Sequence, residues 1–277
     1  MSLKIIGGVY GGRVLRAVKG IGTRPLLGQV REAVFNILQD RVPGAVVWDL
    51  FAGTGASGIE SLSRGAERVL FCEKNGRALD VLRGNLRMLG EDAVARSVVM
   101  KCDAWEPPAM TSSVFGARGG GAVGAGGGGD GDGVADGEGG DEDRAVGDGE
   151  GGDGARDAVP AAAGESATSS APASGSASAE REIAPDLVFL DPPYSLVAED
   201  PVKCLARAHR LLDRTARGGC VVFHFEVGAL DEDDFDGDLD VDLREWGRTA
   251  IAMMWRDGEA PERLQRRWEK ERVREGG

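Results

Sequence analysis

This chain of 277 residues lacks the sequence features of membrane, secreted, disulfide-bonded and metal-binding proteins. It has no apolar run of the roughly 20 residues that a membrane-spanning helix needs. The first residues lack the charged-then-apolar pattern of a secretory signal. The four cysteines lie far apart without a C-x-x-C pair, at Cys72, Cys102, Cys204 and Cys220, which is typical of reduced thiols rather than disulfides or a metal site. We therefore expect a cytoplasmic protein with no metal and no membrane contact.

Histidine, the most frequent general base in enzymes, is represented only by His209 and His224. His209 falls on the surface of an expected helix. His224 lies inside an apolar strand-like run, where a histidine of the core or rim is more common than a catalytic one. We therefore expect a structural role for His224.

Acidic residues outnumber basic ones, and the net charge of −13 at first argues against a nucleic-acid partner. The excess is local, however. Residues 109–185 carry 14 acidic and 4 basic side chains, and the run Asp231–Asp242, expected to form a loop, carries eight acids. The remaining chain is net basic, with seven basic and two acidic residues up to Arg41. Because a polyanion responds to local charge, this distribution is compatible with RNA binding.

Four apolar strand-like runs each carry an acid at or near the carboxyl end. These acids are Asp49, Glu73, Asp103 and Asp191. Strands buried on both faces are typical of parallel sheets, and ligands bind where the carboxyl ends of such strands meet. The alternation of these runs with helical segments predicts an α/β fold. Residues 220–227 should form a fifth strand, and residues 243–255 an antiparallel pair that closes the sheet.

A glycine loop, Gly53-x-Gly55-x-x-Gly58, follows the first of these strands and precedes a helix. Such a loop lets the backbone approach a nucleotide-like ligand. A dinucleotide dehydrogenase would use the glycines for a pyrophosphate and Glu73 for a ribose, which leaves Asp103 unexplained. An S-adenosylmethionine enzyme would use Asp49 and the loop for the methionine part, Glu73 for the ribose and Asp103 for the adenine amine. The second interpretation uses every strand-end acid.

The last acid begins the tetrapeptide Asp191-Pro192-Pro193-Tyr194. The two prolines cannot continue a β-ladder, so the chain must leave the sheet in an extended conformation. A carboxylate, a free carbonyl and a flat ring would then lie together at the rim of the sheet. This combination suits a planar substrate that donates hydrogen bonds, such as a nucleobase.

The composition divides the chain into four parts. Residues 1–41 form a basic hairpin and helix module, and residues 42–108 with 186–256 form the strand-and-helix domain. Residues 109–185, rich in Gly, Asp, Ala and Ser, should be a disordered acidic insertion, because such a segment buries little apolar surface. An inert surface loop is our preferred interpretation of it, and an electrostatic mimic of RNA is the alternative. Residues 257–277 should be a charged helical tail.

Several stretches resemble known methyltransferases. The run Asp49–Ala66 and the Asp-Pro-Pro-Tyr turn resemble class I methyltransferases, which use S-adenosylmethionine. The opening Gly-Gly-x-x-Gly-Gly-Arg, the segments Thr23–Pro25 and Val30–Leu38, and the ending Arg244–Thr249 resemble the RsmD family, the bacterial 16S rRNA guanine-N2 methyltransferases. The acidic insertion stands where that family has a short connection.

The resemblance implies a Rossmann-like class I methyltransferase fold, with a seven-stranded, mostly parallel sheet that has one antiparallel strand. It implies a monomer whose partner is 16S rRNA or a small-subunit assembly intermediate. The implied cofactor-binding residues are Asp49, Phe51, Ala52, Gly53, Thr54, Gly55, Glu73, Lys74, Asp103 and Ala104. The implied catalytic residues are Asp191, Pro192, Pro193 and Tyr194, and the implied RNA-binding residues are Arg13, Arg16, Arg24 and Arg31.

In the mechanism that this family implies, the Asp191 carboxylate and the Pro192 carbonyl accept N–H groups of a flipped guanine, and Tyr194 stacks on the base. Alignment and electrostatics would then drive an in-line methyl transfer. Two alternatives remain open, a DNA or RNA adenine-N6 methyltransferase with the same tetrapeptide and a non-catalytic RNA-binding assembly factor. Loss of activity in Asp191→Ala with RNA binding preserved would favour an enzyme over the binding factor.

Overall fold

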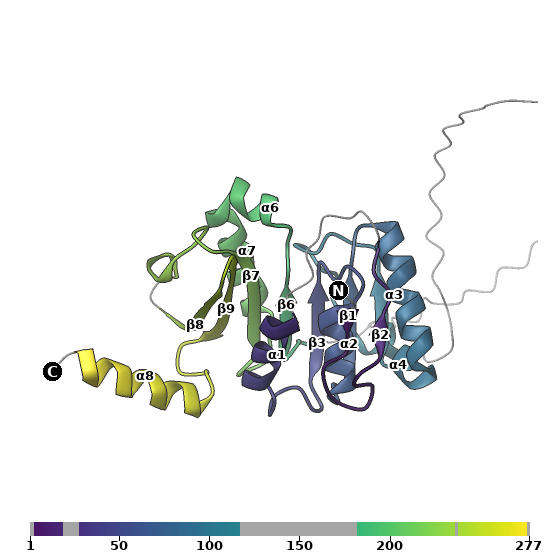
Figure 1. Cartoon of the computed structure of the whole chain (residues 1–277), viewed down its shortest axis with the longest axis horizontal. Coiled ribbons are helices and arrows are strands. Elements are labelled where there is room, and N and C mark those ends of the chain that lie inside the picture. Colours follow the sequence, from purple (N-terminus) through teal and green to yellow (C-terminus); the bar gives the residue numbers. More distant parts are fainter. Residues whose placement is uncertain (1–2, 19–27, 117–181, 236–237, 276–277) are drawn as a thin grey trace, which may run out of the picture. The chain divides into compact units, whose positions relative to one another are not determined.

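The computed structural model describes residues 3–18, 28–116, 182–235 and 238–275. Its main sheet has seven strands (Figure 1). In spatial order these are β5 (Ser97–Met100), β4 (Arg68–Cys72), β3 (Val46–Leu50), β6 (Leu187–Leu190), β7 (Cys220–Glu226), β9 (Thr249–Arg256) and β8 (Leu239–Trp246). Strands β5 to β7 are parallel, and β9 runs antiparallel to both of its neighbours. The predicted seven-stranded α/β sheet with one antiparallel strand is confirmed.

Helices cover both faces of this sheet, because successive side chains of a buried strand point to opposite faces. In β3, Val47 belongs to one apolar core and Trp48 to the other. The first core includes α1 (Gly28–Ile37), α2 (Ala56–Ser63), α3 (Gly76–Leu89), α4 (Glu91–Ala95) and the start of α8 (Glu262–Glu275). The second core includes α6 (Tyr194–Glu199) and α7 (Pro201–Asp213). The two faces are therefore stabilised separately on a shared sheet.

The N-terminal hairpin is confirmed as a separate two-stranded sheet of β1 (Leu3–Lys4) and β2 (Val14–Leu15). It is fastened to α2 by the buried Glu60 carboxylate, which accepts the backbone N–H groups of Ile6 and Gly7 at 2.7 and 2.9 Å. Helix α1 packs on β6 through the stacked rings of Phe35 and Phe189. The hairpin and α1 thus share the first core instead of forming a core of their own.

Two segments differ from expectation. The acidic run expected to be a loop includes a short 3₁₀ turn (Glu232–Asp234) and the start of β8, which begins at Leu239. Asp242 is buried in that strand and is paired with Arg244 at 2.9 Å, which offsets the cost of burying a carboxylate. The other difference is an additional helix, α6, which begins at Tyr194, directly after Pro193, whose backbone is extended as expected.

The two ends of the acidic insertion meet. Thr111 forms an antiparallel bridge with Glu182, just before the short helix α5 (Ser112–Gly116), and the N–H of Ile183 donates to the carbonyl of Met110 at 2.6 Å. Met110 is fully buried, so this closure belongs to the second core. Disorder was predicted for residues 109–185, and it is wrong at both ends of that range, because residues 109–116 and 182–185 form this closure and α5. The rest of the predicted insertion, residues 117–181, lies outside the described residues.

Because the insertion enters and leaves at one point, its replacement should not harm the fold. We expect a variant with a short Gly-Ser linker in place of residues 117–181 to keep or raise the melting temperature. Closing a shorter loop costs less entropy, about 0.6 kcal/mol for each halving of its length. Thermal unfolding of the two proteins checks this, and a fall of more than about 5 °C, or roughly 1–2 kcal/mol, would show that the insertion supports the core.

The cysteines are all free, as the sequence predicts. Cys72, Cys204 and Cys220 are buried, and Cys102 is half-buried. Burial raises the pKa of the Cys204 thiol and the pKa of the Cys220 thiol above the ordinary cysteine value, which keeps these thiols protonated. Within the described ranges, no helix is both long enough and apolar enough to cross a membrane.

Candidate active site

The site is organised around β3, which lies between β4 and β6. The chain continues from β3 to β4 on one side, whereas β6 on the other side comes from much later in the sequence, so the strand order reverses here. Ligands of open α/β sheets bind at such a switch point. Two further backbone hydrogen bonds form just past the carboxyl ends of these strands. The N–H of Ala52 donates to the carbonyl of Cys72 at 3.0 Å, and the N–H of Asp191 donates to the carbonyl of Leu50 at 3.3 Å. The glycine loop therefore lies between the ends of β4 and β6.

The backbone of the glycine loop is shaped for close approach. Among the described residues, Phe51 is the one non-glycine residue with a positive φ, at 60°, and such strain is concentrated at functional sites. Gly53 and Gly55 follow with φ of 54° and 87°. A side chain on Gly53 would meet no atom closer than the Phe51 carbonyl at 4.0 Å, so this glycine borders open space. Gly58 instead lets α2 pack against the ring of Phe71.

Asp49 is hydrogen-bonded to the last glycine of this loop. Its side chain is buried, and Oδ2 accepts the backbone N–H of Gly58, in the first turn of α2, at 2.8 Å. Burial holds the pKa of the Asp49 carboxyl well above its ordinary value, and the hydrogen bond from Gly58 only partly offsets this. The nearby charges of Asp191 and Glu73 raise the pKa further. A cation placed over the loop would therefore stabilise the ionised form of Asp49.

The raised pKa of Asp49 predicts a pH dependence of stability. Between the unfolded value near 3.8 and the raised folded value, the folded protein holds a proton that the unfolded chain releases. The free energy of unfolding should therefore fall as pH rises through this interval. We expect Asp49→Asn, which has no such proton, to lose less stability between about pH 4.5 and 7.5 than the wild type. Denaturant unfolding at several pH values measures this, and parallel curves for the two proteins would contradict it.

Glu73 and Asp103 offer further acceptors at the same edge. Glu73 Oε2 accepts the N–H of Gly53 at 2.8 Å, and Oε1 accepts that of Asn75 at 2.7 Å. Each oxygen of a carboxylate keeps a second lone pair, so both can still accept from a ligand. Asp103 is exposed and uses Oδ1 for the N–H of Trp105 at 3.0 Å. The Trp105 ring packs edge-on against Phe51, with ring centroids 5.2 Å apart, so the segment that carries Asp103 contacts the start of the glycine loop.

The remaining predicted cofactor residues differ in how exposed they are. Ala52 and Ala104 are buried, Thr54 is half-buried, and Lys74 is exposed. The Thr54 carbonyl accepts from the side chain of Asn85 at 3.0 Å. Asn85, on α3, is fully buried and also donates to the carbonyl of Arg16 at 3.1 Å, while its oxygen accepts the N–H of Arg16 at 2.9 Å. Sequence reasoning missed Asn85, which ties the basic hairpin to the glycine loop.

The Asp-Pro-Pro-Tyr turn lies on the other side of the switch point. The Asp191 side chain is half-buried, and Oδ1 is hydrogen-bonded to Nδ1 of His224. His224 Nε2 lies 2.9 Å from the Tyr194 hydroxyl, which also lies 3.1 Å from Oγ1 of Thr249. The rings of Tyr194 and His224 meet edge-on, with centroids 5.1 Å apart. The sequence predicted a structural His224, but both of its ring nitrogens contact predicted catalytic residues.

The four arginines predicted to bind RNA have different environments. Arg13 and Arg16 are exposed, and the guanidinium of Arg13 lies over the Tyr10 ring at 5.3 Å. Arg24 lies outside the described residues. Arg31 is only 2% exposed and donates to the Lys4 carbonyl, and burial lowers the pKa of its guanidinium. Arg31 therefore holds the hairpin against α1 and does not present its charge at the surface, contrary to expectation.

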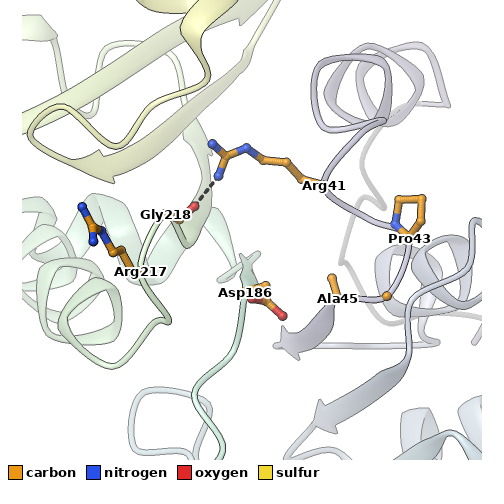
Figure 2. A pocket seen from close by; sticks show the side chains of 7 residues that line it. Arg41, Pro43, Ala45, Asp186, Arg217 and Gly218 are labelled. Carbon is orange, nitrogen blue, oxygen red and sulfur yellow. Dashed lines mark hydrogen bonds between the residues drawn. The ribbon is translucent and has the colours of Figure 1, made fainter.

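A pocket at the opposite edge of the sheet is not part of this site (Figure 2). Ala45 and Asp186, which directly precede β3 and β6, line it together with Arg41 and Arg217. Arg41 points across it and donates to the Gly218 carbonyl. Because β3 and β6 are parallel, their amino ends face away from the edge that carries Asp49 and Asp191. The strand-end acids, not this pocket, define the candidate site.

The first part of the chain is similar in sequence to known proteins. Residues 3–115 match the protein family model described as "Conserved hypothetical protein 95". "Putative rRNA methyltransferase YlbH" of Bacillus subtilis is 40% identical over 87 residues, which are 31% of this chain and 47% of that protein. "Ribosomal RNA small subunit methyltransferase D" of Escherichia coli is 39% identical over 88 residues, which are 32% and 44% of the two chains. The chain thus spans about half the length of these curated relatives.

A solved structure extends the similarity in fold to most of the chain. "Putative methyltransferase yhhF" from Escherichia coli has a TM-score of 0.55 with 19% identity, and the match covers 93% of this chain and 99% of that one. At this identity the similarity concerns the fold alone, which is Rossmann-like. The family model over residues 3–115 and the names of the curated relatives confirm the resemblance to the RsmD family that the sequence motifs indicated.

Proposed function

We propose that this protein transfers a methyl group from S-adenosylmethionine to the exocyclic N2 of a guanine in small-subunit (16S) rRNA. The observation that carries the proposal is the Asp191–Tyr194 turn directly across the switch point from the glycine loop. The names of the curated relatives support an RNA substrate. The substrate would be free rRNA or a small-subunit assembly intermediate, with the protein acting as a monomer.

The residues around the glycine loop fit S-adenosylmethionine. When bound, this cofactor supplies an electrophilic methyl group on a positively charged sulfur. Open space at Gly53 leaves room above the loop, and a cationic ligand there would offset the burial that disfavours the ionised form of Asp49. Glu73 would accept from the ribose hydroxyls and Asp103 from the adenine amine. The other predicted cofactor residues would enclose the cofactor, namely Phe51, Ala52, Thr54, Gly55, Lys74 and Ala104.

The Asp-Pro-Pro-Tyr turn would hold the base. Asp191 Oδ1 is taken by His224, which leaves Oδ2 to accept an N–H of guanine. The Pro193 carbonyl already accepts the N–H of Leu196 at 2.9 Å in the first turn of α6, so the Pro192 carbonyl is the candidate for the second N–H. Two acceptors at this position would orient the exocyclic amine, and the Asp191 carboxylate would receive the proton that the amine loses on methylation. Tyr194 would stack on the flipped base.

The exposed arginines of the hairpin would contact the RNA backbone beside the site, because Asn85 connects Arg16 directly to the glycine loop. We expect Arg13→Ala combined with Arg16→Ala to weaken RNA binding about tenfold and to lower the slope of log K against log salt by about 1.4, or 0.7 for each lost phosphate contact. A matched control is Arg210→Ala with Arg266→Ala, two exposed arginines on α7 and α8. Equal slopes in the two double variants would remove the hairpin from the interface.

The proposal is tested by transfer of labelled methyl groups from S-adenosylmethionine to separated nucleic acids. Ribosomal RNA of the small subunit, large-subunit RNA, transfer RNA and DNA would be supplied in parallel, each from cells that lack this protein. We expect label in small-subunit RNA. Label in DNA alone, or none with any nucleic acid or ribosomal particle despite intact cofactor binding, would overturn the proposal.

A further inference from the structure

We propose that His224 is a positioning residue, which holds the Asp191 carboxylate and the Tyr194 ring in the arrangement that selects the substrate. The inference rests on the proposed function, since it assigns a role within the same site. It goes beyond that function because it makes the acceptor character of Asp191 depend on a histidine of the neighbouring strand.

The sheet register brings these residues together. Leu190 of β6 is paired with Phe223 of β7, so the next residues, Asp191 and His224, face each other where β6 ends. On the other side of β7, Glu226 is paired with Thr249 of β9, which brings the Thr249 hydroxyl to the same place. His224 is 3% exposed, whereas Asp191 and Tyr194 are half-buried, so the histidine is less accessible than either of its partners.

The hydrogen bonds determine where each proton resides. An ionised Asp191 can only accept, so the facing Nδ1 of His224 must carry a hydrogen. In the neutral ring Nε2 is then an acceptor, and the Tyr194 hydroxyl donates to it across 2.9 Å. The Tyr194 oxygen in turn accepts from the Thr249 hydroxyl at 3.1 Å. Hydrogen bonds are therefore donated in one direction, from Thr249 to Tyr194 to His224 to Asp191, and each has one donor and one acceptor.

This arrangement has two consequences for the substrate. The hydrogen bond from Nδ1 occupies Oδ1 and fixes the rotation of the carboxylate, so that Oδ2 is directed to the substrate as an acceptor. The bond to Nε2 holds the Tyr194 ring by its hydroxyl, which leaves the ring face as its contact surface. A carboxylate kept as an acceptor suits a base edge with two adjacent donors, such as N1–H and N2–H of guanine. It disfavours the edge of adenine, where an acceptor lies beside the donor.

A purely structural histidine would not need this arrangement. Space within the core could be filled by an apolar residue, as Phe223 and Phe225 do on either side of His224. Both ring nitrogens instead bond to residues of the candidate site, and the two bonds are made by different atoms. The two contacts can therefore be removed one at a time.

Three substitutions separate these contacts. The side-chain nitrogen of asparagine can occupy the place of Nδ1, so His224→Asn keeps a donor to Asp191 and loses the contact to Tyr194. Glutamine reaches the place of Nε2, so His224→Gln keeps the contact to Tyr194 and loses that to Asp191. His224→Phe keeps the ring volume and loses both contacts.

We expect kcat for methyl transfer to fall about 100-fold in His224→Gln and His224→Phe, because the carboxylate is no longer held in place. His224→Asn should retain kcat within about fivefold while KM for RNA rises, since the Tyr194 ring loses its anchor. Cofactor affinity should stay within about twofold in all three. Equal losses of kcat in the Asn and Gln variants, in proportion to the folded fraction, would reduce His224 to a structural role.

A second measurement does not depend on activity. The chain has two histidines, so His209→Gln leaves His224 as the single source of imidazole signals in ¹⁵N-detected NMR. We expect the Nδ1–H tautomer, with an Nε2 resonance that shifts in Tyr194→Phe. An Nε2–H tautomer would overturn the inference even if the protein methylates RNA. Finding the Nδ1–H tautomer in a protein that methylates no RNA would instead mark a failure of the proposed function.

Discussion

Asparagine at position 191 is expected to lower kcat/KM for methyl transfer to RNA by about 1000-fold, while cofactor affinity stays within about twofold. The Asp191→Asn side chain keeps its shape and can still accept from Nδ1 of His224 through its oxygen. Its NH₂ group then points to the substrate in place of Oδ2. A donor would face the donors of the guanine edge, so the base would lose an acceptor and meet a repulsive partner.

A matched control is Asp200→Asn. Asp200 caps α7 by accepting the N–H of Lys203 at 3.0 Å, and asparagine caps a helix about as well as aspartate. This variant should retain the activity of the wild type. Radiolabel transfer and calorimetric cofactor binding, measured on all three proteins, give the comparison. Retained activity in Asp191→Asn would contradict the acceptor role and favour the adenine-N6 alternative, whose substrate offers an acceptor beside its amine.

Alanine at position 58 is expected to lower both stability and cofactor affinity. A β-carbon on Gly58 would lie 2.2 Å from the Phe71 ring and 2.9 Å from Val69, inside the first core. Because Phe71 is fully buried, the ring cannot move into solvent, and α2 must shift away from β4. Overpacking of this kind costs about 1–3 kcal/mol, and the better helix propensity of alanine returns up to about 1 kcal/mol. The shift would also pull the Gly58 N–H away from Asp49.

The contrasting variant is Gly84→Ala in the interior of α3. A β-carbon there meets no atom within 4 Å, so alanine should stabilise the protein by about 0.5–1 kcal/mol. Thermal unfolding should therefore place the melting temperature of Gly58→Ala below the wild type and that of Gly84→Ala above it. Equal melting temperatures of the two variants would show that Phe71 has room to adjust, and would contradict the packing role of Gly58.

The parts of this account that the sequence predicted are those encoded in local patterns. Apolar runs ending in Asp49, Glu73 and Asp191 predict parallel strands with acids at one edge, because a strand buried on both faces and its terminus are visible in a few adjacent residues. The glycine loop was predicted for the same reason. The residue roles assigned to these positions remain predictions until they are measured.

The parts that the sequence did not predict depend on contacts between distant segments. His224 meets Asp191 only because β6 and β7 are in a particular register. Asn85 reads as an ordinary helix residue until α3 is packed beside the glycine loop and the hairpin. Arg31 has a charged side chain of the kind usually found at the surface, yet it is buried and bonds to Lys4 of the hairpin. In each case the tertiary neighbour, rather than the local pattern, determines what the side chain does.

The central claim is that a guanine N2 is the methyl acceptor, and nucleoside mass spectrometry tests it most directly. Small-subunit rRNA from cells lacking this protein would be incubated with the purified protein and S-adenosylmethionine, and then digested to nucleosides. The account predicts N2-methylguanosine, formed by the wild type and absent with Asp191→Asn. N6-methyladenosine in its place, or no new methylated nucleoside, would contradict it.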